Sequence, residues 1–170
     1  IQPTSKFFTK EWTPEGFAEI ARYLSREHGF QVLLSGGPGE ESKLQSVAER
    51  CEENVIVCRG MSVGELLWVL RGAKLFVGND SGPTHLAAAL GVPSVVLFGS
   101  SDAKVWYPWR APFQQVQNPF DCNPCPGYRC MVYDEPRCIL SITSAQVKAS
   151  VETLLSTPWG AEIDKNAAPK

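Results

Sequence analysis

The chain has 170 residues, enough for one α/β domain with a single hydrophobic core. Its formal net charge is −2, which argues against a basic surface for nucleic acid. No apolar run approaches the ~20 residues that a membrane-spanning helix needs, and no signal peptide is visible. We therefore expect neither a nucleic-acid partner nor a transmembrane segment.

Helical and extended patterns alternate through the first hundred residues. Short apolar runs predict strands at 31–35, 55–58, 74–78 and 94–98. Helices are predicted to begin near Thr13, Ser42, Ser62 and Ser81, and the second of them is predicted to run roughly from Ser42 to Glu53. Ser62 and Glu65 have the spacing of a capping box. This alternation predicts an α/β fold with a doubly wound parallel sheet.

The remainder of the chain has a different character. Proline, aromatic and cysteine residues dominate after Gly99, and no long regular element is predicted before Cys138. Thr143 then begins a last helix with a second capping box. Residues 1–157 are assigned to one domain with a Cys-rich segment at 118–140, and the polar tail 158–170 is expected to be poorly ordered. Residues 1–3 read as the tail of a strand, from which we expect that sequence is missing before them.

The densest group of polar residues occupies 78–85, where a predicted strand ends and a helix begins. In parallel α/β sheets, ligands bind at the carboxyl ends of strands. A helix start there offers free N–H groups to a phosphate, and Gly82 would let it approach the backbone. Asp80, Ser81 and His85 add polar side chains. Taken singly, each residue could be only a cap, a turn or a core histidine; together they predict a ligand site.

The segment 80–93, Asp-Ser-Gly-Pro-Thr-His-Leu-Ala-Ala-Ala-Leu-Gly-Val-Pro, resembles the hallmark segment of glycosyltransferase family nine. That family includes the ADP-heptose:lipopolysaccharide heptosyltransferases. The resemblance extends from about Pro3 to Leu155. It implies a Rossmann-like domain, the carboxy-terminal half of a GT-B glycosyltransferase, with the amino-terminal acceptor domain absent.

Further positions match the family's motifs. Lys10 and Trp12 resemble its Lys-x-Trp motif, whose lysine faces the donor phosphates; from residue type alone, Lys10 could be a solvated surface lysine. Ser5 and Thr4 lie just upstream and could assist.

A second set of matches concerns the nucleoside. The segment 36–40 resembles the glycine-rich loop whose following acid, here Glu40, holds the ribose, with Glu41 as the alternative. Met61 resembles a residue of the adenine pocket, although a gap-filling core methionine is equally open.

Cys122, Cys125, Cys130 and Cys138 lie close together in the sequence. We order the interpretations as reduced structural thiols, then a structural zinc site, then disulfides. The aromatic segment 106–109 could stack on a sugar or cap the core.

The resemblance implies that the full enzyme transfers heptose from ADP-heptose to the lipopolysaccharide inner core with inversion. Lys10 and Asp80 are the expected catalytic residues of this half, which alone is expected to be inactive. The catalytic base is expected in the amino-terminal domain. Neither a cofactor nor a metal is expected for the chemistry. The expected location is the cytoplasm, with peripheral attachment to the inner face of the inner membrane as a further option.

Two rival functions remain open. A nucleotide-sugar epimerase can share the two-domain architecture, and acceptor-dependent transfer would separate it from a transferase. A non-catalytic nucleotide-binding module could keep the same fold. A complete amino-terminal domain with its own carboxylate base would argue against such a module.

Overall fold

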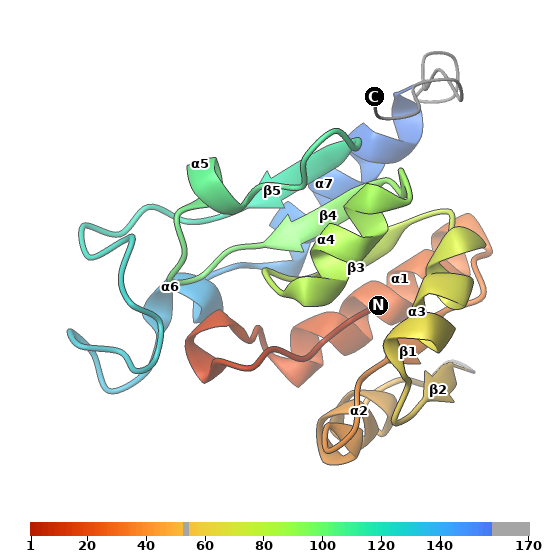
Figure 1. Ribbon diagram of the computed structural model, residues 1–170, viewed down its shortest axis with the longest axis horizontal. Helices are drawn as coiled ribbons and strands as arrows, with labels where there is room; N and C mark the ends of the chain where they lie inside the picture. The colour runs from red at the N-terminus through yellow and green to blue at the C-terminus, as the bar shows by residue number, and fades with distance from the viewer. Residues whose placement is uncertain (53–54, 158–170) are drawn as a thin grey trace.

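The computed structural model describes residues 1–52 and 55–157 (Figure 1), so the predicted tail 158–170 lies outside the described residues. The strands are β1 (Leu33–Ser35), β2 (Ile56–Cys58), β3 (Phe76–Asn79), β4 (Ser94–Leu97) and β5 (Phe113–Val116). The helices are η1 (Phe8–Lys10), α1 (Pro14–His28), α2 (Glu41–Ala48), α3 (Val63–Arg71), α4 (Gly82–Ala89), α5 (Ala103–Trp106), α6 (Arg137–Leu140) and α7 (Ser144–Ser156). None of the helices in these two ranges is long and apolar enough to cross a membrane.

All paired strands run parallel. β1 pairs with β2, and β3, β4 and β5 form a second ladder in that order. The first two residues connect the ladders. The Gln2 N–H donates to the Val77 carbonyl, and the Ser35 N–H donates to the Ile1 carbonyl; both hydrogen bonds are 2.9 Å long. Gln2 forms an isolated parallel bridge with Gly78, so this segment pairs with the sheet although it forms no strand of its own.

Helices cover both faces of the sheet. Val95 and Leu97 of β4 belong to the large core cluster with α1 and α7, whereas Val96 points to the opposite face and packs with Phe98 and Ala103. A separate cluster joins α3 and α4 to Phe76 of β3. Because successive strand residues alternate between faces, the apolar strands need helices on both sides. The predicted doubly wound α/β fold is confirmed.

The residues predicted to begin and end helices form the expected capping geometry in the structure. The Thr13 hydroxyl accepts from the Gly16 N–H at 3.1 Å, and α1 ends at Gly29 with a left-handed φ of 64°. The capping boxes at Ser62 and Thr143 are both complete. Local sequence therefore determines where these helices begin.

Two elements depart from the sequence analysis. β5 is not anticipated: only Val116 of its four residues is buried, so the strand shows little apolar pattern and depends on main-chain pairing with β4. α2 was predicted at 42–53 but ends at Ala48. The buried residues of α2 are Leu44 and Val47. The next residues, Glu49 and Arg50, are charged and exposed, so a longer helix would bury no further apolar side chain at these positions.

Candidate functional site

A cleft of about 830 Å³ opens beside the carboxyl ends of β1 and β3. Its walls come from the segment before η1, the loop after β1, the start of α3 and the start of α4. All eight predicted donor-binding residues line it: Ser5, Lys10, Glu40, Met61, Asp80, Ser81, Gly82 and His85. The fold thus brings together segments that are far apart in the sequence, at the edge where parallel sheets bind ligands.

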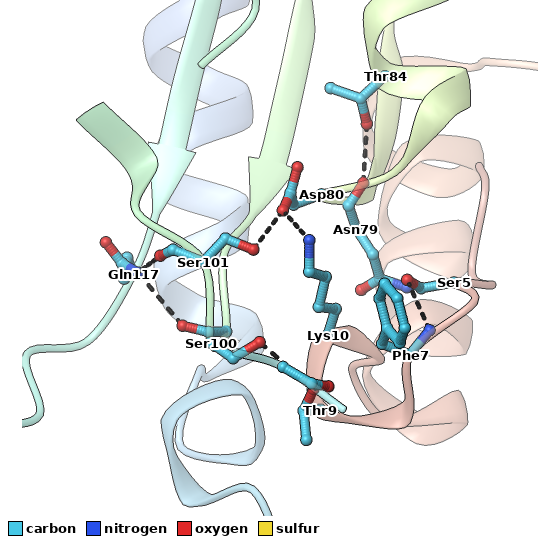
Figure 2. A network of polar contacts seen from close by, with 12 residues as sticks. Ser5, Phe7, Thr9, Lys10, Asn79, Asp80, Thr84, Ser100, Ser101 and Gln117 are labelled. Atoms are coloured by element: carbon cyan, nitrogen blue, oxygen red, sulfur yellow. Dashed lines mark hydrogen bonds and ion pairs between the residues drawn. The ribbon is translucent and has the colours of Figure 1, made fainter. Parts of the chain in front are cut away.

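Two residues that line the cleft, Lys10 and Asp80, form an ion pair (Figure 2). Lys10 Nζ lies 2.7 Å from Asp80 Oδ2, and the Ser101 hydroxyl donates a hydrogen bond of 2.5 Å to the same oxygen. Asp80 is 3% exposed and Lys10 is 19% exposed. Lys10 is therefore not a solvated surface lysine: its ammonium is held in the cleft by a buried carboxylate.

Asn79 fixes the segment that carries Lys10, a role that sequence reasoning missed. Its side chain is fully buried. Its amide Nδ2 donates to the Pro3 carbonyl at 3.0 Å, and its Oδ1 accepts from the Trp12 N–H at 3.1 Å. One side chain at the end of β3 therefore holds both ends of the loop around η1. Its position in the polar segment 78–85 was the available signal.

The start of α4 is open toward the cleft. Ser81 occupies the N-cap position but makes no side-chain cap hydrogen bond, and its buried hydroxyl has no partner among residues 1–52 and 55–157. A Cβ added to Gly82 would meet no protein atom within 4 Å, so protein packing does not require glycine there. Free backbone donors, an unused hydroxyl and open space are what an anion needs at a helix start.

Glu40 is held at the edge of the cleft by its own loop. Its Oε2 accepts from the Thr4 hydroxyl at 2.7 Å and from the Gly37 N–H at 2.8 Å. Gln2 supports Thr4 from behind with a 2.6 Å hydrogen bond. Glu41, the alternative acid, bonds to the Gly39 N–H and does not line the cleft.

Part of the cleft lining is apolar. Met61 lines it together with Val63 and Leu66 of α3. His85 also lines the cleft, and its ring lies 6.2 Å from the Trp106 ring, centroid to centroid. Trp106 also lines the cleft and is 53% exposed.

The other members of the aromatic segment 106–109 do not line this cleft. Tyr107 stacks on Phe113, and Trp109 lies under the Arg110 guanidinium. Of the segment, Trp106 alone lines the cleft, and Pro108 alone is buried.

A second, smaller cavity of about 200 Å³ is lined by Cys122, Cys125, Cys130 and Cys138. All four are free thiols. Burial raises the pKa of the Cys138 thiol, and the proximity of the other three thiols raises it further. Within residues 1–52 and 55–157, no three His, Cys, Asp or Glu side chains already stand in a metal-binding arrangement.

The Cys-rich loop contacts the segments that form the cleft. The Thr9 hydroxyl, next to Lys10, donates to the Gly127 carbonyl. The Cys125 N–H donates to the Ser100 carbonyl at 2.9 Å, next to Ser101. The loop thus supports, from outside, both segments that meet at Asp80.

A model of glycosyltransferase family 9 (heptosyltransferase) matches residues 1–134. The chain belongs to this family. Lipopolysaccharide heptosyltransferase 3 of Escherichia coli K12 is 34% identical over 113 residues, which make up 64% of this chain and 33% of that protein. The predicted family membership is confirmed.

Solved structures extend the match to the fold of this family 9 chain. A family 9 glycosyltransferase from Veillonella parvula superposes with a TM-score of 0.75 and 28% identity, over 91% of this chain and 44% of that one. E. coli heptosyltransferase WaaC with ADP gives a TM-score of 0.68 and 26% identity, over 89% and 42%. The chain spans a third to a half of these relatives, and its fold is the Rossmann-like carboxy-terminal domain of GT-B heptosyltransferases.

Proposed function

We propose that this chain is the donor-binding domain of an inverting glycosyltransferase that uses ADP-heptose. The observation that carries the proposal is the buried Ser81 hydroxyl without a partner, at a helix start that shares its cleft with the Lys10 ammonium. A buried polar group without a partner is costly. A diphosphate placed there would accept hydrogen bonds from Ser81 and from the α4 backbone, and would gain the charge of Lys10.

The two ends of the cleft suit the two ends of an ADP-sugar. Glu40 has its Oε2 engaged by the loop, which orients the carboxylate to accept from ribose hydroxyls. Met61 and the apolar face of α3 would cover the adenine. The structure of the related WaaC contains ADP, which supports adenine as the base. His85 and Trp106 would face the sugar.

In the proposed reaction, an acceptor hydroxyl attacks the anomeric carbon from the face opposite the diphosphate. The carbon–oxygen bond to the diphosphate breaks, and ADP leaves with the electron pair. Lys10 and the α4 backbone N–H groups stabilise the charge that builds on the diphosphate, the role that a divalent metal has in other sugar transferases. Asp80 acts by holding Lys10 in line. A carboxylate on the acceptor domain takes the hydroxyl proton.

The relatives named as lipopolysaccharide heptosyltransferases support the lipopolysaccharide inner core as the acceptor. We assign its binding to an amino-terminal acceptor domain outside this chain, because the chain spans only 33% of lipopolysaccharide heptosyltransferase 3. This acceptor would place the protein in the cytoplasm, at the inner face of the inner membrane.

Calorimetric titration of this chain with ADP, UDP and GDP, with and without Mg²⁺, tests the proposal. We expect preferential ADP binding that does not require the metal. Preference for UDP would keep the diphosphate site and contradict the ADP-heptose assignment. Failure of all three nucleotides to bind would contradict the proposal as a whole.

A further inference from the structure

Three buried polar side chains form a continuous series of hydrogen bonds that ends at Glu40. The Ser35 hydroxyl, at the end of β1, donates to Gln2 Oε1 at 2.8 Å. Gln2 Nε2 donates to Thr4 Oγ1 at 2.6 Å, and the Thr4 hydroxyl donates to Glu40 Oε2 at 2.7 Å. Ser35, Gln2 and Thr4 are all buried. We refer to these three residues as the support network of Glu40.

The direction of each hydrogen bond in the support network is set by Glu40. An ionised carboxylate can only accept, so the Thr4 hydroxyl must donate its one proton to Glu40. Its oxygen must then accept from the Gln2 amide nitrogen, which turns the Gln2 side-chain oxygen toward the Ser35 hydroxyl. Turning the Gln2 amide around would place its nitrogen against Ser35 and its oxygen against Thr4, whose proton is already used. The network therefore has one favourable arrangement.

The support network holds one oxygen of Glu40 and leaves the other for a ligand. Oε2 accepts from Thr4 and from the Gly37 N–H, whereas Oε1 has no hydrogen bond with any residue in 1–52 or 55–157. Glu40 occupies the N-cap position of α2, but its side chain makes no cap hydrogen bond there. The carboxylate thus does not serve the helix, and it lines the cleft.

The position of Gln2 would be easier to fill with an apolar side chain. Gln2 lies between the two ladders, where it bridges to Gly78 of β3. An apolar side chain at this buried position would need no partner, whereas a buried amide must be hydrogen-bonded to avoid a penalty. Gln2 finds its partners in Ser35 and Thr4, and the series they form ends at one carboxylate in the cleft. Orientation of that carboxylate accounts for the polar residues.

We propose that Ser35, Gln2 and Thr4 are positioning residues that aim Glu40 Oε1 at the 2′ hydroxyl of the nucleotide ribose. This inference rests on the proposed function, because it takes the nucleoside to lie at Glu40. A carboxylate that is fixed before the ligand arrives does not have to be ordered on binding, which favours affinity. The support network thereby makes the site selective for a ribonucleotide, since a 2′-deoxyribose has no hydroxyl to donate to Oε1.

Calorimetric titration of the chain with ADP and 2′-deoxy-ADP tests the support network. We expect ADP to bind roughly 10- to 150-fold more tightly, the range for a hydrogen bond to a charged group. Thr4→Val keeps the shape and removes the hydroxyl, so it should reduce this preference by roughly 2- to 10-fold, and Thr4→Ser should restore it.

Thr9→Val is the matched control for the loss of a buried hydroxyl. Thr9 is as buried as Thr4 and lies in the same loop, but its hydroxyl donates to the Gly127 carbonyl and not to Glu40. Thr9→Val should therefore keep the preference for ADP even if it lowers stability. Gln2→Met covers the case in which Thr4→Val fails to fold, because it removes the support of Thr4 and leaves the Thr4 hydroxyl in place; it should reduce the preference in the same direction.

The outcomes separate this inference from the proposed function. Equal affinity of the unchanged chain for ADP and 2′-deoxy-ADP would overturn the inference and leave the diphosphate site standing. The same holds if Thr4→Val and Gln2→Met keep the full preference for ADP, or if Thr9→Val loses as much of it as Thr4→Val does. Failure of the unchanged chain to bind either nucleotide would contradict the proposed function and the inference with it.

Discussion

Lys10 Nζ and Asp80 Oδ2 lie 2.7 Å apart in the cleft, although the residues are 70 positions apart in the chain. The carboxylate is buried and the ammonium is partly open to the cleft. Asp80 therefore orients Lys10 and compensates its charge. Because Ser101 also donates to the same Oδ2, the carboxylate is fixed from both sides.

We expect Lys10→Ala to weaken ADP binding. A hydrogen bond to a charged group contributes about 1.5–3 kcal/mol, so the Kd should rise roughly 10- to 150-fold. Lys74→Ala is the matched control, because Lys74 is exposed and does not line the cleft. Titration calorimetry at one salt concentration measures both. Equal weakening in the two variants would show that Lys10 acts only through the overall charge.

Asp80→Asn should reduce sugar transfer much more than it reduces stability. Asparagine keeps the shape but removes the charge that aims Lys10, and Lys10 can still reach solvent through the cleft. In the complete glycosyltransferase we expect at least a tenfold loss of kcat, with about 1–2 kcal/mol lost from the free energy of unfolding. Asp121→Asn, at an exposed position, should change neither. A protein that fails to fold would assign Asp80 a purely structural role.

Ser81 and Thr143 are the N-cap residues of α4 and α7, but their substitution by alanine should have opposite effects on stability and on ADP binding. The Thr143 hydroxyl caps α7, so Thr143→Ala should cost about 1 kcal/mol of stability and leave ADP binding unchanged. The Ser81 hydroxyl caps nothing, so Ser81→Ala should keep or raise Tm and weaken ADP binding. Thermal unfolding and calorimetry on both variants test this contrast. A drop in Tm for Ser81→Ala would mean that the hydroxyl caps α4 after all.

Alkaline pH should weaken the contact between α1 and α7. The pKa of Tyr23 is raised from 10.0 to about 12. The larger cause is burial of the side chain, and the second is the Glu152 carboxylate, which accepts a hydrogen bond from the Tyr23 hydroxyl. Because the pKa of Tyr23 is higher in the folded state than in the unfolded state, Tyr23 contributes fully to the free energy of unfolding below pH 10. That contribution is lost as the pH rises through 12. Urea unfolding should show wild type losing stability relative to Tyr23→Phe over that range. A constant difference between the two would contradict the prediction.

Local signals predicted much of this architecture. The caps at Thr13, Ser62 and Thr143 stand in the sequence as hydroxyl residues at fixed spacing, and each forms the expected hydrogen bonds. β5 had no such signal, because a half-exposed edge strand is defined by its pairing with β4 rather than by its own pattern.

The members of the site were predictable, but their contacts were not. The resemblance to family nine placed Lys10 and Asp80 in one site, yet no local pattern indicates that they touch each other. The hydrogen bonds of Ser101 and Thr4 likewise depend on how loops from different strands approach each other. Such contacts follow from tertiary packing, which spacing along the chain does not encode.

Asn79→Ala should destabilise the domain and, through it, the cleft. The change removes a fully buried side-chain amide and leaves its two partners, the Pro3 carbonyl and the Trp12 N–H, unpaired. Each buried unpaired group costs about 1–3 kcal/mol, so for the two groups we expect a loss of roughly 2–6 kcal/mol in urea unfolding. Asn118→Ala is the matched control: its amide bonds to Ser141 at an exposed position, where water can replace the lost partner. If ADP restored the stability of Asn79→Ala to that of the ADP-bound wild type, the loop around Lys10 would be held by the ligand and not by Asn79.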